Sequence, residues 1–138
     1  MHDYIIEKYN ENQIFVHDII IPIIVIPNID LILCKIFGIK TRWFQLHSAI
    51  NAIIVLIIWN DVVNLFMNPL QNIEITISKI DNYFILFLHI YHFFIVNDLT
   101  MMDYFHHILF VGGGLLPTLL IKTCNIIRLA WLSVCGLP

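Results

Sequence analysis

Four apolar stretches, separated by polar connections, constrain the fold of this chain more than any other feature of its sequence. They cover residues 14–37, 43–66, 83–96 and 101–121, and a shorter fifth stretch covers residues 126–137. A helix that crosses a bilayer requires about 20 mostly apolar residues. We therefore expect an all-α fold, a polytopic transmembrane helix bundle with four to five helices present. Because the last stretch is too short to cross, we expect the bundle to be C-terminally incomplete.

Composition agrees with a membrane protein. Hydrophobic residues make up 59% of the 138 residues and charged residues only 12%, whereas soluble domains carry about 25% charged residues. The net charge of -3 provides no basic surface for nucleic acid, which we exclude as a partner. The expected partners are the bilayer and a membrane lipid or acyl-lipid substrate, and oligomerisation is left open.

Polar residues divide the chain into two predicted parts. Residues 1–13 form a polar N-terminal segment with three carboxylates and one lysine, and residues 14–138 form a single transmembrane domain. Lys35 at the end of the first apolar stretch, with Lys40 and Arg42 in the connection after it, forms the densest positive cluster. By the positive-inside rule, this cluster favours a cytoplasmic location for that connection.

The second apolar stretch carries polar residues at helical spacing. His47, Asn51 and Asp61 share one face of a helix over residues 43–66 with two isoleucines between them. Polar side chains are costly in hydrocarbon and usually face the interior of a bundle. We therefore expect this face to line an internal cavity.

Histidines are concentrated in the third and fourth stretches. His89 and His92 lie one helical turn apart, and Asp103 lies one turn before the pair His106 and His107. The short connection makes these two helices antiparallel neighbours, so the histidines are predicted to meet at one membrane face.

Thr100 is positioned to cap the fourth helix, and Asp103 to hydrogen-bond one imidazole of the pair. The three glycines at 112–114 are expected to let another backbone approach closely.

Three kinds of chemistry are open to such a cluster, beside a purely structural role in which the side chains exchange interhelical hydrogen bonds. Imidazoles bind metals, act as general bases or acyl acceptors, and bind lipid headgroups. Five histidines, counting His47, are too few for a two-metal lipid oxidase, which needs about eight. We therefore predict no metal ligands and no cofactor, with acyl-CoA as a candidate co-substrate.

At these residues the chain resembles the TLC domain family of polytopic endoplasmic-reticulum membrane proteins. The similarity runs from about Thr41 to Leu120 and rests on the polar residues of the second stretch and on the histidines of the third and fourth. The resemblance implies a helix bundle around a lipid-accessible cavity, an endoplasmic-reticulum location and a role in lipid metabolism.

In the ceramide synthase branch of that family, paired histidines join a fatty acyl group from acyl-CoA to a sphingoid amine. The resemblance therefore gives catalytic positions to His106, His107 and Asp103, and substrate-binding positions to Arg42, His47, Asn51, Asp61, His89 and His92. The chain departs from that branch because no Asp or Glu follows Asp103.

Two further hypotheses stay open beside an N-acyltransferase-like enzyme. One is a non-enzymatic lipid-binding protein that regulates membrane composition or trafficking, and the other is a histidine-ligated, metal-dependent lipid oxidase. Only the two enzyme hypotheses require the histidines for a chemical product.

Overall fold

A computed structural model describes residues 2–40, 42–69, 75–76, 78–96, 99–120 and 123–135 of the chain. Its elements are α1 (His2–Phe37), α2 (Arg42–Met67), β1 (Ile75–Thr76), α3 (Ile80–Ile95), α4 (Met101–His107), the π-helix η1 (Ile108–Leu115), α5 (Leu116–Leu120), β2 (Thr123–Cys124) and α6 (Asn125–Cys135). The described part is all-α apart from the antiparallel pair of two-residue strands β1 and β2. The predicted all-α fold class is confirmed.

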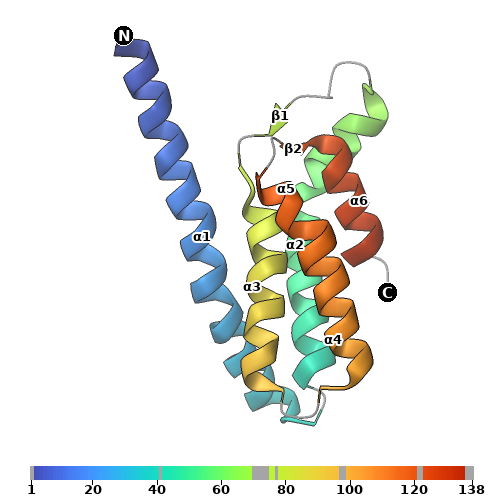
Figure 1. Cartoon of the computed structure of the whole chain (residues 1–138). Helices are drawn as coiled ribbons and strands as arrows, with labels where there is room; N and C mark the ends of the chain where they lie inside the picture. Colours follow the sequence, from blue (N-terminus) through green and yellow to red (C-terminus); the bar gives the residue numbers. More distant parts are fainter. Residues whose placement is uncertain are drawn as a thin grey trace.

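The helices run alternately up and down, side by side (Figure 1). α1 and α3 end at the same end of the bundle at which α2 and α4 begin, and α6 returns from the opposite end. We call the end at which α1 and α3 stop and α2 and α4 begin the histidine end, because it carries His47, His89, His92, His106 and His107.

Two helices are long and apolar enough to cross a membrane, at Phe15–Phe37 and Arg42–Met67. The third predicted stretch forms α3, which is apolar but only 16 residues long. The fourth forms the consecutive elements α4, η1 and α5, and the fifth forms α6. The predicted boundary at residue 14 falls within α1, which continues through Pro22 and Pro27.

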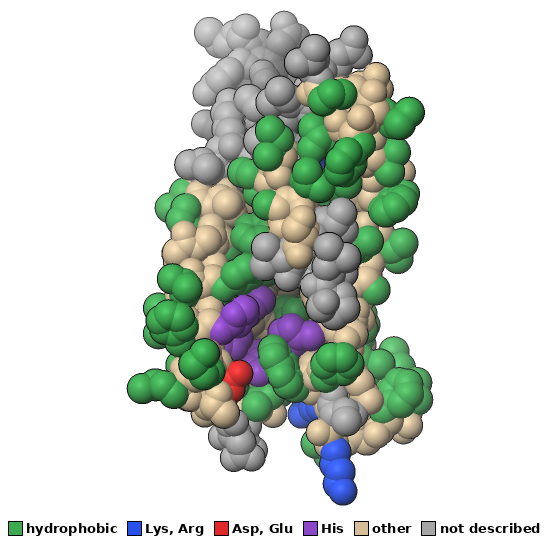
Figure 2. All heavy atoms as spheres, turned by 90° about the vertical axis from the view of Figure 1, so that its right-hand side faces the viewer, with side chains coloured by type: hydrophobic (Ala, Val, Ile, Leu, Met, Phe, Trp, Pro, Cys, Tyr) green, Lys and Arg blue, Asp and Glu red, His purple; other side chains and the backbone are tan. Residues whose placement is uncertain are grey.

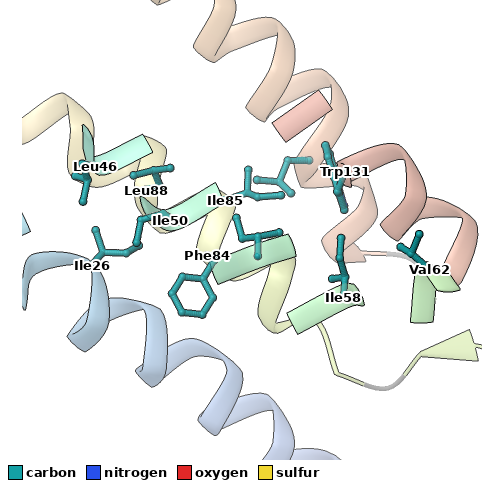
Figure 3. Close-up of a cluster of buried hydrophobic side chains, with 11 residues drawn as sticks. Ile26, Leu46, Ile50, Ile58, Val62, Phe84, Ile85, Leu88 and Trp131 are labelled. Atoms are coloured by element: carbon teal, nitrogen blue, oxygen red, sulfur yellow. The ribbon is translucent and has the colours of Figure 1, made fainter. Parts of the chain in front are cut away.

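The core consists of aliphatic side chains from α1, α2 and α3 together with Phe84 of α3, and it is extended by Leu115 of η1 and Trp131 of α6 (Figure 3). In α2 the buried residues recur every four positions, as expected for one face of a helix. The outer surface is also apolar, because hydrophobic side chains cover most of the described face in Figure 2. Soluble monomers rarely expose apolar area of this extent, so the surface suits a lipid environment.

The glycine run at 112–114 does not have its predicted role of letting another backbone approach closely. It lies within η1, and a Cβ atom added at any of these three positions would meet nothing within 4 Å among the described residues. No described helix therefore packs closely against it. Since π-helices are rare and frequently occur near functional sites, the more informative feature is that η1 begins directly after His107.

Candidate histidine site

Three separate helices bring five histidines to one end of the bundle. His47 lies near the start of α2, His89 and His92 lie near the end of α3, and His106 and His107 end α4. The up-down order of the helices explains the meeting, because the end of α3 lies beside the beginnings of α2 and α4 (Figure 1).

The start of α4 is fixed by the predicted cap. The Thr100 hydroxyl accepts a hydrogen bond from the backbone N–H of Asp103, and the Asp103 carboxylate accepts one from the backbone N–H of Thr100. This capping box satisfies two backbone donors of the first turn. It confirms Thr100 as the cap and sets where the following histidine pair falls.

The imidazole rings lie close to one another across the helices. The ring centroids of His92 and His107 are 5.3 Å apart, those of His47 and His92 5.2 Å, and those of His89 and His107 5.0 Å. His106 lies 5.9 Å from His89. The structure therefore brings together all five histidines that the sequence analysis placed in the site.

Aromatic side chains surround the cluster. The Trp43 ring packs edge to face against His47 and His92, with centroids 3.4 and 3.6 Å apart. Phe93 packs against His107, and Phe110 stacks on His106. The cluster therefore has mostly apolar surroundings, in which ring nitrogens are the principal polar groups. No role in the site was predicted for Trp43 from the sequence.

Two of the rings are oriented by their own helices. Nδ1 of His47 lies 3.2 Å from the carbonyl oxygen of Trp43, and Nδ1 of His89 lies 2.7 Å from that of Ile85. A carbonyl oxygen can only accept, so Nδ1 carries the proton in each neutral ring and Nε2 keeps the lone pair. Both rings therefore present a proton acceptor away from their own backbone.

Three buried imidazole nitrogens have no hydrogen-bond partner among the described residues. They are Nε2 of His47, Nδ1 of His92 and Nδ1 of His107. Buried polar atoms in folded proteins are nearly always hydrogen-bonded, and unpartnered ones call for an explanation such as a ligand. Their concentration in one pocket distinguishes this cluster from histidines that only join helices.

The cluster reaches the outside of the bundle. His107 and His92 are buried, whereas His106 is exposed. In Figure 2, histidine side chains gather towards the lower end of this face, among hydrophobic side chains and beside an acidic one. The His106 imidazole is therefore accessible from outside the bundle on this side.

Asp103 does not make the predicted hydrogen bond to the histidine pair. Its Oδ2 accepts from both the backbone N–H and the hydroxyl of Thr100, at 2.7 and 2.6 Å. No hydrogen bond to an imidazole is found for this carboxylate within the described residues. Capping and imidazole orientation compete for the same group, and capping prevails because a helical side chain tilts toward the N-terminus, back to Thr100 and away from the histidine pair.

The other predicted site residues lie around or away from the cluster. Asn51 is half-buried one turn beyond His47, and no described residue hydrogen-bonds to it. Asp61 lies 14 residues beyond His47 along α2, which is about 21 Å at 1.5 Å per residue. It is ion-paired with Arg128 of α6. Although it shares a helix face with His47, it is therefore too distant to line the same pocket.

Arg42 is at the histidine end but is held by α1. Its Nε donates to Oδ1 of Asp30 at 2.7 Å, and its Nη2 donates to Oδ2 of the same carboxylate. The hydroxyl of Tyr91 also donates to Oδ2, at 2.8 Å. Asp30 has a fully buried side chain. The sequence analysis missed Asp30 as the partner, since the two residues lie in different helices.

A second polar cluster at the opposite end was also missed. Asp18 of α1 accepts from the Ser78 hydroxyl and from the backbone N–H of Lys79, and Arg128 lies 3.7 Å from Asp81 of α3. The Lys79 ammonium donates to the carbonyl oxygen of Leu119 at 2.7 Å, and burial lowers its pKa from the usual value. From the sequence, residues 67–82 were interpreted as a polar connection without chemistry. Asp18 and Arg128 lie in the first and fifth apolar stretches, and no partner was predicted for either.

The described residues contain no group of three His, Cys, Asp or Glu side chains arranged to hold a metal ion. Comparisons of the chain with models of protein families, with curated proteins and with solved structures find no match. The TLC resemblance therefore remains a prediction.

Proposed function

We propose that this chain is an integral membrane protein whose histidine cluster acts on an acylated membrane lipid. The observation that carries the proposal is the convergence of five imidazoles from three helices with three buried, unpartnered ring nitrogens. A packing role alone would leave those nitrogens without the hydrogen bonds that justify their burial. A substrate with hydrogen-bonding groups would supply the missing partners.

The reaction that suits the site best is transfer of an acyl group from acyl-CoA to an amine, as the TLC resemblance implies. Each neutral imidazole offers one lone-pair nitrogen, which can take the proton from an attacking amine. The new bond forms between the amine nitrogen and the acyl carbon, and the carbon–sulfur bond of the thioester breaks. The imidazole then returns the proton to the departing thiolate, so no oxidant or other cofactor is required.

Position assigns different tasks to the paired histidines. His106 is exposed and contacts a lipid that approaches from outside the bundle. His107 is buried, and its unpartnered Nδ1 is the candidate base. His89 and His92 pack against His107 and complete the pocket.

The test uses purified protein in liposomes supplied with palmitoyl-CoA and sphinganine, with the N-acyl product measured by mass spectrometry. The proposal expects product from the wild type and at least a hundredfold loss in His107→Ala, in line with loss of a general base. His17→Ala is the matched control, since His17 is exposed on α1 outside the cluster. Absence of N-acyl product from folded wild-type protein would overturn the acyl-transfer step.

A non-enzymatic lipid-binding protein is the second candidate. It is favoured by the commitment of Asp103 to the helix cap, which leaves no described carboxylate hydrogen-bonded to an imidazole. Such a protein would retain a lipid that co-purifies in wild type and is weakened, but not abolished, in His107→Ala. It would give no product in the liposome reaction.

The endoplasmic reticulum is the compartment we propose, on the TLC resemblance alone. Tagged protein in eukaryotic cells should co-fractionate with an endoplasmic-reticulum marker. Its co-fractionation with plasma-membrane or mitochondrial markers would contradict that location.

A further inference from the structure

An apolar cavity lies between α1 and α3, separate from the histidine pocket. Its volume is about 300 Å³, and its walls include Pro22 and Pro27 from α1 and Phe87, Ile90 and Phe94 from α3. The two prolines carry short, compact side chains where a longer one would fill the space opposite the aromatic rings. The cavity is an elongated site, because its wall residues span more than one turn of each helix.

The end of the cavity nearest the histidine end has a polar boundary. Tyr91 lines the cavity, and its hydroxyl donates to Asp30, which is ion-paired with Arg42. Asp30 accepts from Nε and Nη2 of Arg42 and from the Tyr91 hydroxyl, so its carboxylate is already satisfied. Arg42 keeps a quarter of its side chain exposed. The apolar cavity thus ends beside a partly accessible guanidinium.

The same end of the bundle is positively charged. Between residues 30 and 42 the chain has three cations, Lys35, Lys40 and Arg42, against the single carboxylate Asp30. Both lysines are exposed, Lys35 in the last turn of α1 and Lys40 just beyond its end. Basic side chains at the end of a membrane helix lie at headgroup level and attract anionic lipids.

We propose that the cavity between α1 and α3 binds one acyl chain of an anionic phospholipid, with the lipid phosphate beside Arg42 and Lys40. The apolar walls accept the chain, and the adjoining positive charge selects the headgroup. A zwitterionic lipid would fill the same cavity without the electrostatic gain. This binding does not depend on the histidine cluster.

Native mass spectrometry of the detergent-solubilised full chain tests the proposal after incubation with equal amounts of dioleoylphosphatidylglycerol and dioleoylphosphatidylcholine. We expect one retained lipid, with the anionic one preferred about thirtyfold, because each of the two accessible lysines contributes about a factor of five. Ile90→Trp should abolish retention, because Ile90 is a partly exposed wall residue and the larger ring fills the cavity. Leu56→Trp is the matched control, since Leu56 is 77% exposed on α2 and does not line the cavity.

The headgroup part is tested with the double variant Lys35→Gln and Lys40→Gln, which should retain one lipid without preference between the two. His107→Ala should retain phosphatidylglycerol as the wild type does, which separates this result from the test of the histidine site. Equal retention of both lipids by the wild type, or undiminished retention in Ile90→Trp, would overturn the proposal.

Discussion

His92 of α3 and His107 of α4 face each other with ring centroids 5.3 Å apart, and Nδ1 of each ring is buried without a described partner. The two residues are 15 positions apart in the sequence and are joined by a turn whose helix start is fixed by Thr100. The geometry of the site therefore depends on how the helix ends are held.

Trp43 should be a structural support of the pocket, because its ring contacts both His47 and His92. The side chain is 37% exposed, so Trp43→Ala should cost about 2 kcal/mol, less than a fully buried tryptophan. Thermal unfolding in detergent measures the loss. Trp59→Ala, at an exposed position on the same helix, should change the midpoint little; an equal change in both variants would argue against the support.

Arg42 should be required to neutralise the buried carboxylate of Asp30. Arg42→Gln leaves that charge uncompensated and should destabilise the fold by about 3 kcal/mol. Adding Asp30→Asn should recover much of the loss, because the buried group is then neutral. Denaturation of both variants in detergent checks this. A double variant as unstable as Arg42→Gln alone would show that Arg42 and Asp30 are not coupled. Lys40→Gln is the control, because it removes an exposed charge.

Arg128 should hold α6 against the rest of the bundle. It is ion-paired with Asp61, lies 3.7 Å from Asp81 and donates to the carbonyl oxygen of Ser78 at 2.9 Å. Arg128→Met leaves two carboxylates without their cation, and we expect faster amide hydrogen exchange throughout α6. Unchanged protection of residues 126–131 would mean that Trp131 packing alone keeps α6 in place.

Thr100 and Asp103 should act as one unit in the helix start. Thr100→Ala removes a cap and should cost about 1 kcal/mol, with faster exchange in the first turn of α4. If Asp103 serves only the cap, Asp103→Ala should reduce N-acyl product no more than Thr100→Ala does. A much larger loss in Asp103→Ala would restore its predicted role beside the imidazoles.

Helical periodicity and charge were sufficient to predict the helices and the meeting of the histidines. The short connection between α3 and α4 made those helices neighbours, and the spacing of His89 and His92 set their common face. Asp61 shows the limit of this reasoning, because a shared helix face says nothing about the axial distance of about 21 Å from His47.

The buried ion pairs could not be predicted in the same way. Asp30 meets Arg42, and Asp18 meets Ser78, across helices whose relative register is set by packing. Likewise, the glycine run gave no indication of a π-helix, because the chain there is equally compatible with an α-helix. Contacts between elements, not the elements themselves, were the part that the sequence left undetermined.

The account depends on imidazoles from α3 and α4 sharing one pocket, which thiol bridging tests directly. His92→Cys and His107→Cys are introduced together after the three native cysteines have been replaced by serine, and the protein is treated in liposomes with dibromobimane. This reagent becomes fluorescent when it bridges two neighbouring thiols. The account predicts strong fluorescence for this pair and none for a control pair at His17 and His107, whereas a dark 92–107 pair in folded protein would contradict it.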